Sequence, residues 1–305
     1  MTRRTVSAAG FLAFPMAVLF LFTLLPTVAG LALSLFQWDG ATDPRFVWFS
    51  NFEQLGNDPR FFPALRNTLW YVLATVPPTV FFGFLLSIAL HAKWFRGKVL
   101  IRTAIFLPTI VSIVAIGFVW RWLLDDQGGL IPALYNGLVG QLESGHIRPG
   151  FLPLRAPSML QDGAWPMRWV IIVTIWRGVG FCMVLYLAAL AGIPEHLYEA
   201  AAVDGASDRD MVRHITWPMV APMTVFLLVT GVISALQVFD IIWALTAGTE
   251  TAATRVLNLF VYREFQQSRL GYAAAIGAVI FGLTILATAA QLTVFRRAAT
   301  GGQGA

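Results

Sequence analysis

Residues 193–222 read IPEHLYEAAAVDGASDRDMVRHITWPMVAP, and this stretch decides the fold. It is the only long run of mixed charge and small residues that apolar segments flank closely on both sides. Pro194 suits the first position of a helix, and Gly205 suits the left-handed residue that ends it. Ser207 and Asp210 have the spacing of a capping box, which starts a second helix. The stretch therefore predicts a helix, a sharp turn and another helix between two membrane spans.

The composition indicates a membrane protein. Of the 305 residues, 57% are hydrophobic and 12% are charged, whereas soluble proteins carry about 25% charged residues. The chain has a single cysteine, Cys182, which excludes both a disulfide framework and a cysteine-rich metal site. The net charge of +5 comes from basic residues spread in ones and twos along the chain. This spread is typical of charges that flank membrane spans and argues against a nucleic-acid partner.

The chain contains six candidate spans, because one crossing of the lipid bilayer takes roughly 20 predominantly apolar residues. A cleaved signal peptide is the rival interpretation of the first span, but its apolar run is too long for one. The segments outside the spans include a short amino terminus at 1–9, the hairpin loop at 193–218, a long outer loop at 125–166 and a tail at 298–305. We expect an all-α polytopic membrane protein with spans at residues 10–36, 68–90, 101–123, 168–191, 219–245 and 271–295.

The distribution of basic residues predicts the orientation. With the amino terminus inside, the counts of Lys and Arg on the two sides are equal, so the count alone does not decide. The cytoplasmic pieces are roughly half as long in total, and long loops translocate largely regardless of charge. The densest basic cluster, with Lys93, Arg96, Lys98 and Arg102, marks a cytoplasmic turn. Both termini are therefore expected in the cytoplasm.

The spacing in the hairpin loop resembles the EAA loop of permease subunits of binding-protein-dependent ABC importers. Trp217 stands where that family usually has Leu. The segments LYEAA, VDGAS and ITWP, with FLPTIVSIVA and LGYAAAIGAVIFGLTIL elsewhere, are similar to the sugar-importer branch. An ordinary amphipathic hairpin is the alternative. The resemblance assigns coupling with an ATPase to Glu199, Ala200, Ala201, Asp204, Gly205, Ile215 and Pro218.

The resemblance covers residues 10–297 and is weakest over 125–166. Residues 245–250 read LTAGTE where the family commonly has LT-x-Gly-Gly-Pro, which puts the local turn in doubt. The implied fold is a type I importer bundle in the bacterial cytoplasmic (inner) membrane. The implied partners are a second permease subunit of different sequence, a dimeric ATP-binding subunit that holds ATP and Mg, and an extracytoplasmic binding protein that delivers a sugar-like solute.

The chain has no energy source of its own. It lacks a G-x-x-x-x-G-K-[ST] phosphate loop, and its histidines do not cluster with other metal ligands. We therefore expect a transport subunit that is not an enzyme and holds no cofactor or metal. A secondary transporter driven by an ion gradient is the alternative, but it would need acidic residues at mid-membrane, where only Asp240 stands, near a span end. A membrane enzyme is disfavoured because no paired acid and base recurs on one face.

One charge lies deep within a span, Arg177 in VIIVTIWRGVGFCMVLYL. Ionisable residues at such positions are costly and usually face the bundle interior or a watered cavity. The alternative is that Arg177 snorkels outward or pairs with Asp240. With an arginine in the pathway, sugar phosphates and glycerophosphodiesters are candidate solutes in addition to neutral oligosaccharides.

On the fifth span, Thr230, Ser234 and Gln237 share a face and can bind hydroxyl groups, with polar packing between helices as the alternative. Trp176 and Phe181 suit stacking on a sugar face, although aromatic residues in apolar helices often serve packing alone. In the resembled family this part of the fourth span contributes to the solute crevice. The residues assigned to the substrate pathway are Thr174, Trp176, Arg177, Gly178, Phe181, Ser234 and Gln237.

Overall fold

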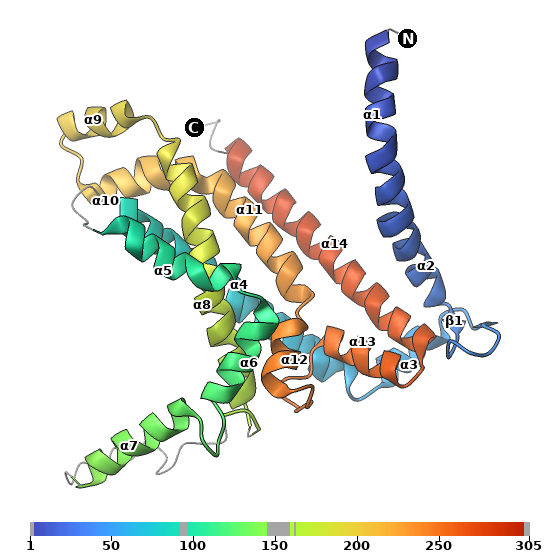
Figure 1. Ribbon diagram of the computed structural model, residues 1–305. Helices are drawn as coiled ribbons and strands as arrows, with labels where there is room; N and C mark the ends of the chain where they lie inside the picture. Colours follow the sequence, from blue (N-terminus) through green and yellow to red (C-terminus); the bar gives the residue numbers. More distant parts are fainter. Residues whose placement is uncertain (1–2, 92–96, 145–158, 162, 302–305) are drawn as a thin grey trace. The chain divides into compact units, whose positions relative to one another are not determined.

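The structure is a computed structural model that is predominantly helical (Figure 1). The expectation of an all-α polytopic membrane protein is therefore confirmed. Lys93, Arg96, much of the expected outer loop and the end of the expected tail lie outside the described residues. The structure describes residues 3–91, 97–144, 159–161 and 163–301.

The described part of the chain contains five helices that are long and apolar enough to cross a membrane, and a bent pair that brings the number to six if it counts as one span. Each of the five overlaps one of the spans expected from the sequence. Their bounds are Phe11–Leu33, Phe61–His91, Trp165–Ala191, Asp208–Leu236 and Leu270–Phe295.

The third span, expected as one helix over residues 101–123, is broken. It consists of α5 (Lys98–Ile110) and α6 (Ile113–Leu123), which are bent by 98° relative to each other. Between them, the backbone of Val111 is extended and that of Ser112 is not helical. A break of this kind leaves the last carbonyl groups of α5 without helical donors, so other groups must satisfy them.

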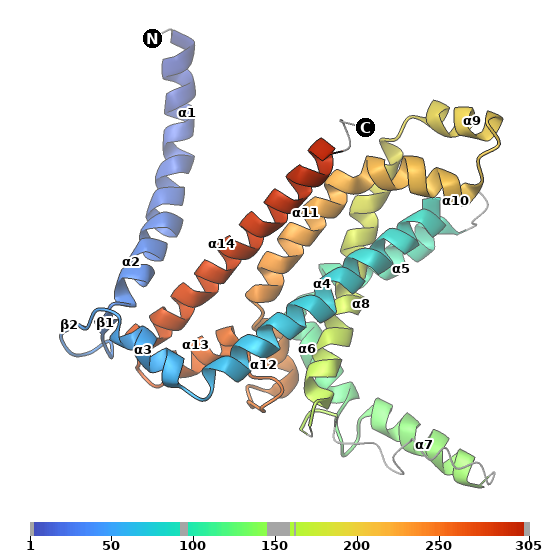
Figure 2. The ribbon, with the colours of Figure 1, turned by 180° about the vertical axis from the view of Figure 1, so that it is seen from behind.

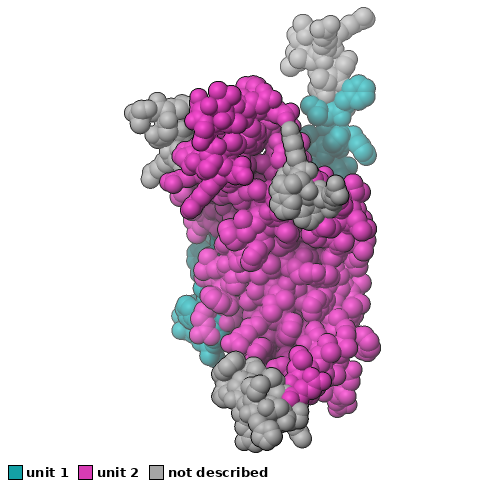
Figure 3. All heavy atoms as spheres, turned by 90° about the vertical axis from the view of Figure 1, so that its left-hand side faces the viewer, with its two compact units in different colours: residues 1–65, 257–283 teal, residues 66–256, 284–305 magenta. Residues whose placement is uncertain are grey.

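The first of two compact units, unit 1, comprises Met1–Leu65 and Leu257–Leu283 (Figure 3). Its two short strands pair antiparallel, with Phe36 opposite Phe46. The Asn51 amide ties this pair to the helices by donating to the carbonyl oxygens of Ser34 at 2.8 Å and Phe36 at 2.9 Å. The elements are α1 (Arg3–Leu19), the π-helical η1 (Phe20–Leu24), α2 (Leu25–Leu33), β1 (Phe36–Gln37), β2 (Arg45–Phe46), α3 (Ser50–Asn57), the start of α4 (Phe61–His91), α13 (Leu257–Gln266) and the first part of α14 (Leu270–Gly301).

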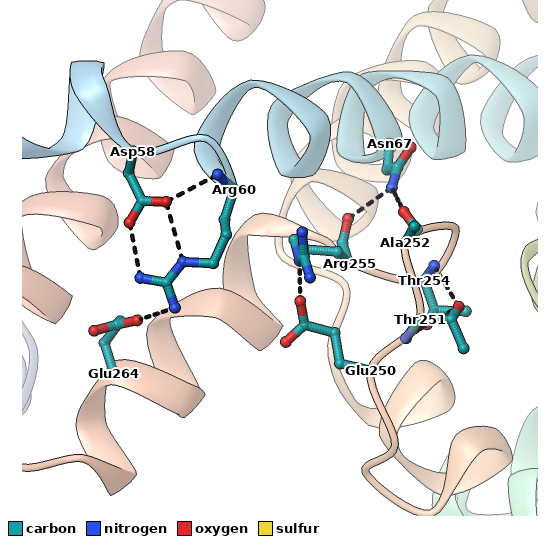
Figure 4. A network of polar contacts seen from close by, with 9 residues as sticks. All are labelled: Asp58, Arg60, Asn67, Glu250, Thr251, Ala252, Thr254, Arg255 and Glu264. Atoms are coloured by element: carbon teal, nitrogen blue, oxygen red, sulfur yellow. Dashed lines mark hydrogen bonds and ion pairs between the residues drawn. The ribbon is translucent and has the colours of Figure 1, made fainter.

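The core of unit 1 joins residues that are far apart in the sequence. Leu55 of α3 packs with Leu257 and Phe260 of α13 and with Tyr272 and Ile276 of α14, and all five are almost fully buried. A small polar network accompanies this apolar core (Figure 4). At its centre lies the Glu264 carboxylate, which is 0% exposed and pairs with two arginines.

The second compact unit, unit 2, comprises Arg66–Val256 and Thr284–Ala305. Within it, α5 and α11 each pack on α8, and α12 packs on α6 and α8. Figures 1 and 2 show α9 and α10 at one end of the unit and α6 and α12 at the other. Besides the rest of α4, α5, α6 and the end of α14, its elements are α7 (Leu130–Ser144), α8 (Trp165–Ala191), α9 (Glu195–Val203), α10 (Asp208–Met211), the π-helical η2 (Val212–Thr216), α11 (Trp217–Leu236) and α12 (Asp240–Thr246).

Glycines let the helices of unit 2 approach closely. A Cβ at Gly180 of α8 would meet the carbonyl oxygen of Ile105 of α5, and a Cβ at Gly83 of α4 would meet Cys182 of α8. Small residues at helix interfaces are typical of membrane bundles, because packing there replaces the hydrophobic effect.

The fifth span also differs from expectation, since residues 219–245 do not form one helix. The helix α11 ends at Leu236, residues 237–239 are not helical, and α12 begins at Asp240. A carboxylate in the first turn of a helix is stabilised by the helix dipole, which explains why a new helix starts there.

The turn after α12 is held to α4 within unit 2. The side-chain amide of Asn67 donates to the carbonyl oxygens of Ala252 at 2.8 Å and Arg255 at 3.0 Å. Arg255 also pairs with Glu250 (Figure 4). The doubtful LTAGTE turn is thus closed by left-handed Ala247 and Gly248 and by these polar contacts.

Candidate functional site

The hairpin between α8 and α11 turns at Gly205, whose φ of +79° is in the left-handed region. The amide of Ala206 donates to the carbonyl of Ala201 at 2.9 Å, and the amide of Gly205 donates to the carbonyl of Ala202 at 3.1 Å. These two bonds form a Schellman motif that satisfies the end of α9. Gly205 therefore ends the helix as predicted, whereas Pro194 precedes the helix as its N-cap residue.

The second half of the hairpin begins with the predicted capping box. The Asp210 amide donates to the Ser207 hydroxyl at 3.3 Å, and the Ser207 amide donates to the Asp210 carboxylate at 3.2 Å. From α10 the chain passes through η2 into α11 without a break. Pro218 lies in the first turn of α11, so it joins a continuing helix and does not start a separate one.

Side chains outside the set predicted for ATPase coupling brace the hairpin. The hydroxyls of Tyr198 in α9 and Thr216 in η2 lie 3.0 Å apart, and the rings of Trp217 and Phe84 have centroids 5.1 Å apart. The Trp217 ring thus contacts Phe84 of α4. The resembled family usually has the smaller Leu at this position. Val203 at the end of α9 is 88% exposed.

The residues assigned to ATPase coupling lie together on this hairpin or where it joins α11. Their side chains are available to a partner to different degrees, because two are half-buried and five are exposed. The half-buried residues are Ala201 and Ile215, and the exposed ones are Glu199, Ala200, Asp204, Gly205 and Pro218.

A cavity of about 510 Å³ lies inside unit 2. Its walls come from α4, α8 and α11, with Ile113 of α6 and the start of α12. The volume falls within the roughly 300–1,000 Å³ of small-molecule sites. Among the described residues, the polar groups that line it are Tyr71, Thr75, Thr79, Thr174, Arg177, Thr230, Ser234, Gln237 and Asp240.

Close helix contacts shape this cavity. A Cβ at Gly178 of α8 would lie 2.8 Å from a methyl carbon of Thr79, and a Cβ at Gly231 of α11 would lie 2.9 Å from a methyl carbon of Val76. Both glycines therefore let their helices approach α4. The Tyr71 hydroxyl reaches across from α4 to α8, where it lies 3.0 Å from the Thr174 hydroxyl.

Arg177 lies at the break in the third span. Its Nη2 donates to the carbonyl oxygen of Thr109 at 3.3 Å, and the Thr109 hydroxyl donates to the carbonyl of Arg177 at 3.0 Å. Thr109 is in the last turn of α5, whose carbonyl groups need donors and favour a cation. The alternative pairing with Asp240 is not formed, although both side chains line the cavity.

Six of the seven residues assigned to the pathway line this one cavity: Thr174, Arg177, Gly178, Phe181, Ser234 and Gln237. Trp176 does not line it. Its ring instead lies with its centroid 5.7 Å from that of Trp120 in α6. One position along a helix turns a side chain by about 100°, so Trp176 points away from the cavity that its neighbour Arg177 lines. The assignment of Trp176 to the substrate pathway stays a prediction.

The contribution of α4 to the cavity was missed. Tyr71, Thr75 and Thr79 follow one another at intervals of four residues, and this spacing puts them on one face of α4. A polar stripe in an otherwise apolar span was the signal that could have identified this wall. Within the described part of the chain, no group of three or more His, Cys, Asp and Glu side chains could hold a metal.

The helical spans, the polar cavity inside unit 2 and the exposed hairpin define a membrane transport protein of the permease class. The chain belongs to the family described as "Binding-protein-dependent transport system inner membrane component", which matches residues 65–300. It is thus the membrane-spanning component of a transport system.

Similar proteins extend over most of the chain. The "Probable ABC transporter permease protein YurN" of Bacillus subtilis is 31% identical over 92% of this chain and 94% of its own length. The "Lactose transport system permease protein LacF" of Rhizobium radiobacter is 32% identical over 88% of this chain and 87% of its own. A solved chain of a bacterial ABC transporter involved in the import of alginate has the same fold, with a TM-score of 0.79, 24% identity and coverage of 96% of this chain and 98% of that chain.

Proposed function

We propose that this chain forms half of the pathway of an ATP-driven importer for a carbohydrate. The observation that carries the proposal is the cavity of unit 2, whose size suits a small solute and whose walls combine hydroxyl groups with the aromatic rings of Tyr71 and Phe181. Hydroxyl and aromatic groups together suit a sugar. Membership of the binding-protein-dependent family supports an importer and disfavours a transporter driven by an ion gradient. The relative named for lactose supports a carbohydrate.

The partners follow from the same proposal. A second permease subunit of different sequence completes the pathway, and an extracytoplasmic binding protein delivers the solute. A separate dimeric subunit binds ATP and Mg and hydrolyses the nucleotide, because this chain lacks a phosphate loop. The protein resides in the bacterial cytoplasmic membrane with both termini inside.

The hairpin is proposed as the contact with the ATPase. Glu199 offers charge-assisted hydrogen bonds on an exposed surface, and the small Ala200 beside it permits close approach. The Schellman motif and the capping box hold the two helices of the hairpin in a fixed relationship, so force applied to α9 is passed to α11. Closure of the ATPase then moves the bundle as a rigid body between inward-open and outward-open states.

The orientation is tested by cysteine labelling. Ala202→Cys places a single exposed thiol on α9 once the native thiol is removed by Cys182→Ala. A membrane-impermeant maleimide should label this thiol in inverted vesicles and leave it unlabelled in intact cells. Gln54→Cys on the exposed side of α3 is the matched control and should label in intact cells. Labelling of Ala202→Cys from outside would overturn the proposed coupling role.

The partners are tested by purification of the complex from its native membrane. A second permease, an ATPase and a binding protein should co-purify with this chain, and the reconstituted complex should import a carbohydrate at the expense of ATP. Recovery of the chain alone, together with proton-driven uptake, would contradict the importer.

A further inference from the structure

The cavity of unit 2 contains a cation that forms no ion pair with a described residue. Among the described lining residues, Arg177 is the one basic side chain. A guanidinium has five N–H donors, and the described structure uses one, the 3.3 Å bond from Nη2 to the Thr109 carbonyl. Its Nε is buried without an acceptor, and Arg177 forms no ion pair with a described residue. The Arg177 side chain therefore keeps an unpaired positive charge and unused donors within an apolar span, an arrangement that is costly unless a partner compensates it.

Four threonine hydroxyls of the cavity have the opposite property, because their protons are already donated. Thr75, Thr79 and Thr230 each donate to a carbonyl one turn earlier in their helix at 2.7 Å, and Thr174 does so at 2.8 Å. Since Thr174 uses its proton in this way, the Tyr71 hydroxyl is the donor in their 3.0 Å contact. These hydroxyls retain acceptor capacity only. They suit the hydroxyl protons of a sugar, whereas acceptor groups of the solute must find donors elsewhere.

We propose that Arg177 is a specificity-determining residue that selects carbohydrates bearing an anionic group, either a carboxylate or a phosphate. This inference rests on the proposed carbohydrate import and adds the charge of the solute. The planar guanidinium binds two oxygens of a carboxylate or phosphate at once, which gives it both charge and geometry that a hydroxyl cannot match. The threonine hydroxyls then accept from the hydroxyl groups of the same solute.

Asp240 defines where the anionic group can lie. It is the one acidic side chain among the described lining residues, and it is exposed in the first turn of α12. A carboxylate there accepts hydrogen bonds from hydroxyl groups and repels a second anion. The solute therefore presents hydroxyls to Asp240 and its anionic group to Arg177.

Matched pairs of solutes test this proposal. The complete importer in nanodiscs is titrated calorimetrically with cellobiose and cellobiouronic acid, which differ by a carboxylate, and with trehalose and trehalose 6-phosphate, which differ by a phosphate. The unchanged importer should bind at least one anionic member roughly 10- to 100-fold more tightly than its neutral parent, the range that a hydrogen bond to a charged group contributes. The pair that shows the preference identifies the source of the negative charge.

Variants separate recognition from the structural contact with α5. Arg177→Gln should abolish the preference while the affinity for the neutral parent changes by less than about twofold, and Arg177→Lys should keep part of the preference because it keeps the charge. Thr109→Val removes the hydroxyl bond to the Arg177 carbonyl and should keep the preference. If Arg177 serves only to cap α5, Arg177→Gln weakens both members of a pair equally, and the proposal fails.

The outcomes also separate this proposal from the one on which it rests. Tighter or equal binding of the neutral members in the unchanged importer overturns the selection of anions and leaves carbohydrate import standing. Binding of none of the four solutes contradicts both.

Discussion

The Glu264 carboxylate lies 2.9 Å from Nη1 of Arg60 (Figure 4) and 2.7 Å from Nη1 of Arg269, and its own side chain is fully buried. Arg60 comes from the segment before α4, and Arg269 comes from the turn before α14. One buried anion therefore joins three segments of unit 1. Both guanidinium groups also stack on aromatic rings, Arg60 on Phe260 and Arg269 on Tyr272, each with 4.7 Å to the ring centroid.

Glu264→Ala should lower the free energy of unfolding by about 3 kcal/mol, because removal of one partner from a buried ion pair leaves the other charges uncompensated. Arg60→Ala should cost less, since Arg269 still pairs with Glu264. Denaturant titration of the purified protein in detergent measures both. Glu53→Gln on the exposed side of α3 is the control and should change the value by less than about 0.5 kcal/mol. A loss for Glu264→Ala as small as that of the control would contradict a structural role for this pair.

Asp58 should make the stability of unit 1 depend on acid pH. Hydrogen bonds from the Arg60 guanidinium lower the pKa of this carboxyl to about 2, and the Tyr272 hydroxyl donates a further bond at 2.9 Å. The unfolded chain binds the proton first as pH falls. The stabilisation is therefore complete above pH of about 4 and is lost as pH falls through about 2.

The expected contribution of Asp58 is about 2 kcal/mol, since its side chain is only 9% exposed and a pKa difference of one unit corresponds to about 1.4 kcal/mol. Unfolding free energies of the unchanged protein and of Asp58→Asn should therefore differ most above pH of about 4 and converge toward pH 2. Tyr272→Phe, which removes one donor, should give an intermediate loss. A difference between the unchanged protein and Asp58→Asn that does not vary with pH would contradict this account.

Local chemistry made parts of this structure predictable from the sequence. Gly205 and the pair Ser207 and Asp210 act on their own backbone within a few residues, so their spacing alone specified the cap and the box. Apolar runs of sufficient length likewise indicated where helices cross the membrane. The polar face of the fourth span followed from helical spacing once Arg177 was identified.

Other features depend on packing between distant segments and could not be predicted in the same way. At the 98° bend at Val111 and Ser112, the carbonyl of Thr109 accepts from Arg177, which is far away in the sequence. The Trp176 ring packs against Trp120 in another helix. The sequence of a single span does not predict such contacts, because any face of an isolated apolar helix could pack against a neighbouring helix.

Gly180 should tolerate no larger side chain, because a Cβ there would meet the carbonyl oxygen of Ile105, and backbone cannot move aside cheaply. Gly180→Ala should cost about 1–3 kcal/mol through overpacking between α5 and α8. Gly277→Ala in α14 is the matched control, since nothing lies within 4 Å of a Cβ at that position. It should leave stability unchanged or raise it by up to about 1 kcal/mol through helix propensity. Thermal unfolding in detergent compares the two, and equal effects would contradict the close contact.

Substitutions in the hairpin should separate ATP hydrolysis from uptake. Gly205→Asp introduces a side chain at φ +79°, which costs about 1–2 kcal/mol locally, and Glu199→Lys reverses an exposed charge on α9. Neither change touches a spanning helix, so the permease should still insert and assemble. If the hairpin transmits the motion of the ATPase, both variants should lower uptake per ATP hydrolysed by roughly 5- to 150-fold, the range of typical coupling free energies.

The measurement is parallel ATPase and uptake assays on one reconstituted preparation, with insertion verified by labelling of the hairpin. Glu53→Lys reverses an exposed charge on α3 and should keep the normal ratio of uptake to hydrolysis. A general loss of folding would lower both activities together and leave the ratio unchanged, so the ratio separates uncoupling from instability. Because α9 and α11 are joined by the Schellman motif, the capping box and the Tyr198–Thr216 contact, a change at the tip of α9 can reach the cavity through this connection. Normal ratios in both hairpin variants would mean that the ATPase acts on this chain at another surface.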